Sequence, residues 1–351
     1  MSHYFLRAHT SKGYVSFAED TMKNFKDTIV LTGGSKKLRE DLLIRLLNKD
    51  GQGPAADTRY IHLVDGKTVD GISIGRELLI LAEHPQDHLE VKDVQRMNLD
   101  ECIHLNGNRS SLGESFSQIG EAESRVHRSF REGVAIHEKK EELYLKGMDF
   151  SKADQAAEDV IDIMFQNAGQ VRKSASPLSE EILFGGATAF GPVNFINEIT
   201  RPLNHRLIIK GRSGSGKSTL MRKVVKNAQA SGLSVKVFPC GLDPESLDMV
   251  VLPELGFALL DGTAPHVINP SGEGDQVIDM FERCMDPEVE QTYAKELQDL
   301  SLAYQHKMRE GTAALKEVLE LEEEIDRKIA ACVDQAGFNS LAERLLKRIS
   351  G

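Results

Sequence analysis

One short segment constrains the fold of this 351-residue chain more than any other, namely Gly211-Arg212-Ser213-Gly214-Ser215-Gly216-Lys217-Ser218-Thr219. It matches the pattern G-x-x-x-x-G-K-[ST], in which glycines let backbone N–H groups close around phosphates. An apolar run from Leu207 to Ile209 precedes it, and apolar residues at helical spacing follow it between Leu220 and Ala228. The sequence therefore predicts a strand, a phosphate-binding loop and a helix, in that order.

The same motif assigns roles to single side chains. We expect Lys217 to reach the β- and γ-phosphates of a bound nucleotide and the Ser218 hydroxyl to ligate Mg²⁺. Sites of this kind usually hold the metal through a second carboxylate at the end of another strand. The run Phe257-Ala258-Leu259-Leu260-Asp261 has that form, so Asp261 is the candidate, with a turn residue as the alternative interpretation.

Three further carboxylates are weighed as members of the site. Glu254 follows Pro253 and is a candidate base that orients an attacking water or a substrate hydroxyl. Asp243 and Asp248 follow an apparent strand that ends near Phe238, and either capping of the next helix or catalysis explains them.

A constant separation of 178 residues aligns the two halves of the chain without gaps. It pairs Gly33 with Gly211, and the apolar run Ile29 to Leu31 with Leu207 to Ile209. Asp65 and Asp70 pair in the same way with Asp243 and Asp248. We therefore predict two tandemly duplicated α/β units, each a small, mainly parallel sheet flanked by helices with a helical extension. A Gly-, Ser- and Pro-containing segment places the boundary between residues 1–176 and 177–351.

The phosphate-binding motif survives only in the second unit. At the aligned positions the first unit has Lys36 for Gly214, Leu38 for Gly216 and Arg39 for Lys217, with Glu40 and Asp41 replacing Ser218 and Thr219. Side chains at the glycine positions and two carboxylates beside a triphosphate both oppose binding. We therefore expect residues 1–176 to form a degenerate, inactive domain, with Arg39 or Arg7 as an arginine it could contribute to the other site.

A long helical region is expected at roughly residues 275–349, where few Gly or Pro residues occur. It carries an apolar stripe made of Leu315, Val318, Leu319, Ile325, Ile329 and Val333. The stripe is most simply an internal packing face, and a dimeric coiled coil is the alternative.

These motifs resemble those of P-loop NTPases, with an intact Walker A sequence in the second half. The chain more closely resembles a group of uncharacterised bacterial tandem-P-loop ATPases described as nucleotide-kinase-like. The likeness rests on Ile208 to Arg212 with the loop that follows, Cys240 to Asp248, and Asp261 to His266. It implies the P-loop fold and a nucleotide ligand, and the altered residues 36 to 41 depart from it.

Composition narrows the classes of partner. A net charge of −11 argues against nucleic acid, and no apolar run reaches the length needed to span a bilayer. The four cysteines are widely spaced and predict neither a zinc site nor disulfides. With no basic segment and apolar core at the start of the sequence, we expect a cytoplasmic protein.

The sequence favours an Mg²⁺-dependent ATP-binding protein that hydrolyses ATP at one site in the second half, with a regulatory first half. A kinase for a nucleotide or small molecule and a non-catalytic nucleotide-sensing module are the alternatives. ATP is preferred over GTP because no guanine-reading N-K-x-D motif is found. The acceptor, any protein partner and self-association stay open.

Overall fold

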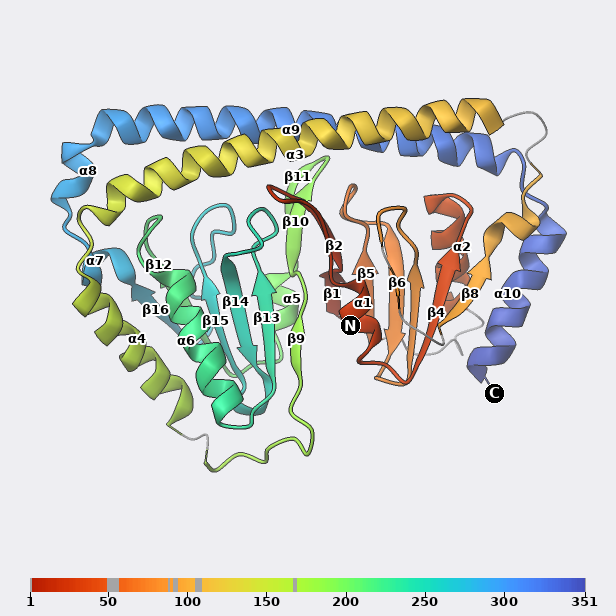
Figure 1. Cartoon of the computed structure of the whole chain (residues 1–351). Coiled ribbons are helices and arrows are strands. Elements are labelled where there is room, and N and C mark those ends of the chain that lie inside the picture. Colours follow the sequence, from red (N-terminus) through yellow and green to blue (C-terminus); the bar gives the residue numbers. More distant parts are fainter. Residues whose placement is uncertain are drawn as a thin grey trace.

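The computed structural model describes residues 2–48, 57–87, 89–90, 94–104, 109–166 and 169–350. Two six-stranded mixed sheets lie side by side beneath a pair of long helices (Figure 1). The strands of the first sheet, in spatial order, are β1 (Ser2–Phe5), β5 (Thr58–Ile61), β6 (Val69–Ile74), β7 (Leu78–Ala82), β4 (Asp27–Thr32) and β8 (Gln95–Asn98). Only β6 runs opposite to its neighbours, because both of its pairings are antiparallel.

The second sheet repeats the first strand by strand. Its order is β9 (Ser179–Glu181), β13 (Val235–Pro239), β14 (Leu247–Leu252), β15 (Phe257–Asp261), β12 (His205–Lys210) and β16 (Asp275–Asp279), and here β14 is the reversed strand. Even the irregularity in the ladder recurs, between Tyr60 and Ile61 in one sheet and between Phe238 and Pro239 in the other. The two sheets therefore bear out a duplicated α/β arrangement.

Each unit also repeats a hairpin and a short helix. The hairpins are β2 (Arg7–Thr10) with β3 (Gly13–Ser16), and β10 (Gly185–Thr188) with β11 (Gly191–Asn194). The short helices that follow are α1 (Ala18–Met22) and α5 (Ile196–Thr200). Residues of both sheets, α1 and α5 together form one hydrophobic cluster, so the two units share a core.

The edges where the sheets meet pair equivalent residues with each other. Phe5 and Leu183, which lie 178 positions apart, exchange two backbone hydrogen bonds of 2.9 and 3.1 Å in an antiparallel bridge. Equivalent residues can pair antiparallel only across a twofold axis, so the two units are related by an approximate internal twofold.

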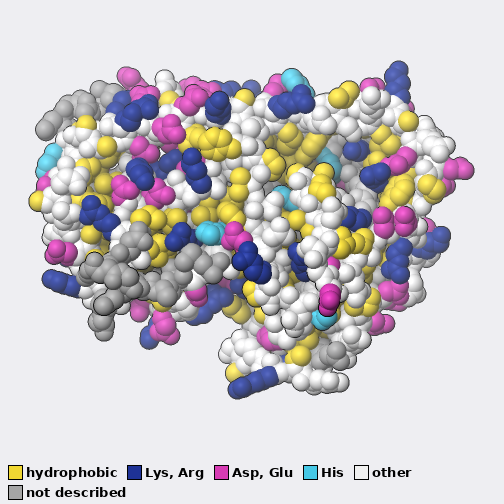
Figure 2. Space-filling model, turned by 180° about the vertical axis from the view of Figure 1, so that it is seen from behind, with side chains coloured by type: hydrophobic (Ala, Val, Ile, Leu, Met, Phe, Trp, Pro, Cys, Tyr) yellow, Lys and Arg dark blue, Asp and Glu magenta, His cyan; other side chains and the backbone are white. Residues whose placement is uncertain are grey.

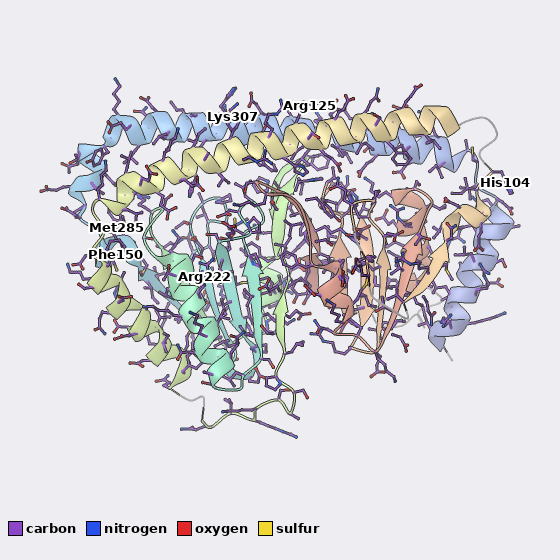
Figure 3. All side chains as sticks on the ribbon, viewed as in Figure 1. His104, Arg125, Phe150, Arg222, Met285 and Lys307 are labelled. Atoms are coloured by element: carbon purple, nitrogen blue, oxygen red, sulfur yellow. The ribbon has the colours of Figure 1, made fainter. Side chains whose placement is uncertain are left out.

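Two helices of 37 residues each cross both units, α3 (Arg109–Leu145) from the first half and α9 (Ala294–Ala330) from the second (Figure 1). Ion pairs join Arg125 to Glu317 at 2.6 Å and Glu132 to Lys307 at 2.8 Å. Because positions advance along α3 while they decrease along α9, the helices are antiparallel. Arg125 and Lys307 mark this pair in Figure 3. Leu315, Val318 and Leu319 of the predicted stripe pack against α3, which confirms an internal packing face.

The helical extension of each half covers the sheet of the other. Helix α4 (Phe150–Phe165) packs Ala156, Val160 and Met164 into the second-half core, beside α6 (Lys217–Ala230). Helix α10 (Gln335–Ser350) packs into the first-half core beside α2 (Lys36–Asn48), with Phe338, Leu341 and Leu345 buried there. The boundary at residues 176 and 177 stays a prediction for the sequence repeats, whereas the packed bodies exchange these helices.

Short elements complete the chain around these bodies. The 3-10 helices are η2 (Leu99–Cys102) and η3 (Pro253–Leu255), and the helices α7 (Met280–Cys284) and α8 (Glu288–Thr292) lead into α9. Two more bridges, Ile103 with Val333 and Met148 with Met285, connect the ends of the long helices to the opposite halves. No helix within the described ranges is long and apolar enough to cross a membrane.

The exchange predicts that α10 stabilises the first half. Leu345→Ala removes a fully buried side chain and should lower the free energy of unfolding by about 2–5 kcal/mol, measured by urea denaturation. Leu302→Ala on α9 is the control, since Leu302 is 58% exposed and its loss should change stability by less than about 0.5 kcal/mol. Equal effects of the two substitutions would show that α10 adds no core.

Candidate functional site

The predicted strand, loop and helix are present as β12, residues 211–216 and α6. Gly214 and Gly216 have φ of 75° and 82°, a conformation that other residues rarely adopt. Arg212 is exposed at the rim, Ser215 is buried below the loop, and Thr219 points to solvent on α6. Gly216 precedes α6 and has no side chain to cap it, so the first amides of α6 remain directed at the loop.

Lys217 is the first residue of α6, and its ammonium lies inside the loop. It donates hydrogen bonds to the carbonyl oxygens of Gly211 and Arg212 at 3.5 and 2.9 Å. It also lies 3.7 Å from Asp261 Oδ2. This proximity follows from the sheet, because β12 and β15 are parallel neighbours with Ile209 opposite Asp261. The structure therefore brings Lys217 and Asp261 together.

Ser218 and Asp261 are both held by local hydrogen bonds. Ser218 Oγ accepts from the backbone N–H of Leu247 at 3.0 Å and from Arg222 at 2.6 Å. Asp261 Oδ1 accepts from the backbone N–H and the hydroxyl of Thr263 at 2.9 and 2.6 Å. Asp261 thus has the turn geometry of its alternative interpretation while its other oxygen faces Lys217.

Asp248 joins this group from the start of β14. Burial and the nearby Asp261 carboxylate raise the pKa of Asp248 to about 7, and Lys217 acts in the opposite direction. The thiol of Cys240 is hydrogen-bonded to Asp248, and its own pKa is raised by burial and by that carboxylate. Sequence reasoning left Asp248 between capping and catalysis, whereas the structure places it beside Lys217 and Asp261.

Glu254 requires a correction, because it lies at the opposite edge of the sheet. Strand β14 runs antiparallel to its neighbours, so the residues after it emerge where β13 begins. There Glu254 Oε1 accepts a 3.1 Å hydrogen bond from the backbone N–H of Ser234. The structure does not bring Glu254 to the loop, and it has no place in the candidate site.

Helix α3 of the first half closes over the loop. Ser213 Oγ lies 3.1 Å from His137 Nε2, and a Cβ built on Gly214 would lie 3.1 Å from Glu141 Cγ. Arg212 Nε donates to Glu290 of α8 at 2.6 Å, and Glu290 also accepts from Tyr144 of α3 at 3.2 Å. No motif points to these α3 residues, since they lie in the other half of the sequence.

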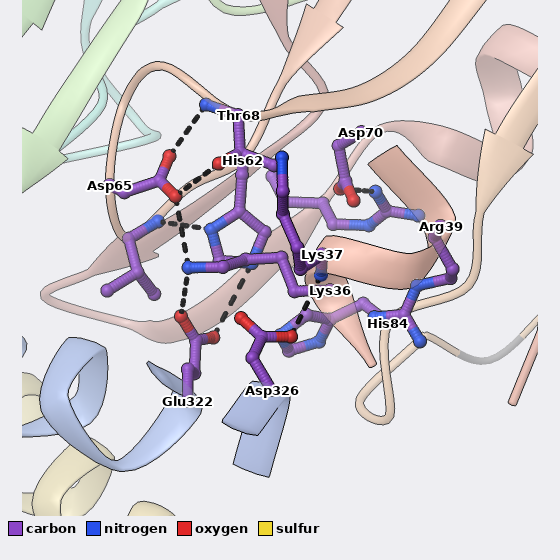
Figure 4. A network of polar contacts seen from close by, with 12 residues as sticks. Lys36, Lys37, Arg39, His62, Asp65, Thr68, Asp70, His84, Glu322 and Asp326 are labelled. Atoms are coloured by element: carbon purple, nitrogen blue, oxygen red, sulfur yellow. Dashed lines mark hydrogen bonds and ion pairs between the residues drawn. The ribbon is translucent and has the colours of Figure 1, made fainter. Parts of the chain in front are cut away.

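The matching position in the first half is closed by side chains (Figure 4). Residues 36–38, aligned with the loop, form the first turn of α2. The Lys36 ammonium contacts Asp65 at 3.0 Å and Glu322 of α9 at 3.1 Å, and these carboxylates raise its pKa against the effect of burial. Burial raises the pKa of Glu322 to about 7.

Neither arginine considered for the second site reaches it. Arg39 NH1 donates to the carbonyls of Gly33 and Gly34, repeating in the first half the contacts of Lys217. Arg7 is 3% exposed and bonds to Asp70 and Asp87 in the first unit. The residues that the first half gives to the second site come instead from α3.

On the face seen in Figure 2, basic and acidic side chains are interspersed, and no basic surface for nucleic acid stands out there. Among the described residues, no group of three or more His, Cys, Asp or Glu side chains is placed to hold a metal ion.

Comparison with protein-family models gives no match, and no curated protein and no solved structure matches the chain significantly. Function is therefore argued from the geometry of the site.

The raised pKa of Asp248 predicts a pH effect on stability. Between its ordinary pKa of 3.8 and about 7 the folded carboxyl keeps a proton that the unfolded chain has lost. The free energy of unfolding should therefore fall as pH rises through this window, by up to about 4 kcal/mol from this group.

Asp248→Asn removes this titration. Its stability relative to the unmodified protein should improve from pH 4 to pH 7 and change little above pH 8, as measured by urea denaturation at each pH. A difference that does not vary with pH would contradict the assignment.

Proposed function

We propose that the chain binds Mg²⁺–ATP at residues 211–219 and hydrolyses it. The observation that carries this proposal is the loop itself, where two glycines in the left-handed region leave the amides of α6 uncapped beside the Lys217 ammonium. Helix N-termini with such amides bind anionic phosphate groups, and an ammonium adds charge-assisted contacts.

Ser218 and Asp261 fit the demands of Mg²⁺. Both offer hard oxygen donors next to Lys217, and magnesium in phosphate sites takes only one or two protein carboxylates beside water and phosphate oxygens. When bound, the ion would neutralise charge that develops on the phosphates. Ser218 and Asp261 would hold it, and Asp261 would do so with the oxygen that Thr263 leaves free.

Asp248 replaces Glu254 as the candidate base. A base is most effective when its pKa lies near the working pH, and the pKa of Asp248 is raised to about 7. In this role it accepts a proton from the attacking water, while Lys217 and the loop amides hold the phosphates in place.

The proposal predicts that Lys217→Ala weakens ATP binding. Loss of one charge-assisted contact, about 1.5–3 kcal/mol, lowers affinity about 10- to 150-fold. Calorimetric titration with Mg²⁺–ATP measures the affinity, and phosphate release measures turnover. Lys226→Ala is the matched control, because Lys226 is an exposed lysine on the same helix.

Three results separate the proposal from its rivals. Equal affinity of the Lys217 and Lys226 variants would overturn the proposal. Lys217-dependent binding without phosphate release would favour the sensing module, and phosphate loss that requires an added acceptor would favour a kinase.

A further inference from the structure

The two long helices carry a carboxylate at the same position. Glu141 is the 33rd of 37 residues in α3, and Asp326 is the 33rd of 37 residues in α9. Under the internal twofold these two residues face the loop of the opposite half. Their surroundings show what each carboxylate does there.

In the first half, Asp326 takes the place that a phosphate would occupy. Its Oδ1 accepts a 2.9 Å hydrogen bond from the backbone N–H of Lys37, in the first turn of α2. Ser35 Oγ accepts from Leu38 N at 3.3 Å and caps the same turn. A carboxylate at this end of a helix also interacts favourably with its dipole. The contact is reinforced by Glu322, one turn earlier on α9, which pairs with Lys36.

In the second half, Glu141 lies over the corresponding loop without such a bond. Its side chain and its backbone carbonyl approach the Cα of Gly214, with an added Cβ falling 3.1 and 3.3 Å from them. The positive charge of Lys217 favours the ionised carboxylate, although burial raises the pKa of Glu141 overall. His137, one turn earlier and equivalent to Glu322, makes a contact with Ser213 that carries no ion pair.

We propose that Glu141 is an internal anionic plug, which competes with the phosphates of a nucleotide for the loop and for Lys217. The inference rests on the proposed function. Binding of ATP lifts this part of α3 away from the loop, so the first half controls access to the site in the second. Asp326 shows the same contact in a form locked by hydrogen bonds and ion pairs.

The test compares Glu141→Gln and Glu141→Ala with Glu142→Gln, using the full-length chain. Glu142 is an exposed neighbour on the same helix and serves as the matched control. Removal of the plug charge should tighten Mg²⁺–ATP binding about fivefold or more in both Glu141 variants and raise the rate of phosphate release. Thermal melts of each variant confirm that the folded population is the same.

The outcomes separate this inference from the proposed function. If the unmodified protein binds ATP through Lys217 but the Glu141 variants match the Glu142 control or bind more weakly, the plug is wrong and the function stands. If neither the unmodified protein nor any variant binds ATP, both fail.

Discussion

The packing of α3 against α9 is the interaction on which the rest of the structure depends. Phe130 of α3 fills the space left by Gly311, and Met308 of α9 fills that left by Gly133, so a side chain larger than hydrogen at either glycine would collide. These two contacts fix the register of the antiparallel pair. Because each helix continues into an element that covers the opposite sheet, the register also sets where α4 and α10 dock.

Both halves use the same backbone plan for different local ends. In the second half glycines at 214 and 216 keep the chain in a loop, and α6 begins at Lys217. In the first half Lys36 and Leu38 stand at these positions, and α2 begins three residues before the position aligned with Lys217. Residues with a Cβ favour right-handed helical angles over the left-handed region, so the loop becomes an extra helical turn.

Local sequence patterns predicted local structure well. The apolar run before Lys210 and the helical spacing after Lys217 correspond to β12 and α6, and the separation of 178 residues matches two sheets of the same strand order. Asp261 was also placed correctly beside Lys217, because a strand that is parallel to β12 must end at the same edge.

Global arrangement lay beyond those patterns. Glu254 was misplaced because the direction of β14 depends on its pairing with distant strands. The apolar faces of α4 and α10 predict burial without identifying the partner, so the exchange between halves leaves no mark in the sequence. His137 and Glu141 were missed for this reason, since only the exchange carries α3 across to the second loop.

The exchange gives a physical reason for retaining a half whose loop is closed. A carboxylate near uncapped helix amides and a lysine is stable only if its lost hydration is replaced, and the internal twofold supplies such a carboxylate to both loops. In the first half a network of Lys36, Asp65 and Glu322 replaces that hydration fully. In the second half Lys217 shares its hydrogen bonds with two backbone carbonyls, and the weaker closure leaves the loop accessible to a stronger anion.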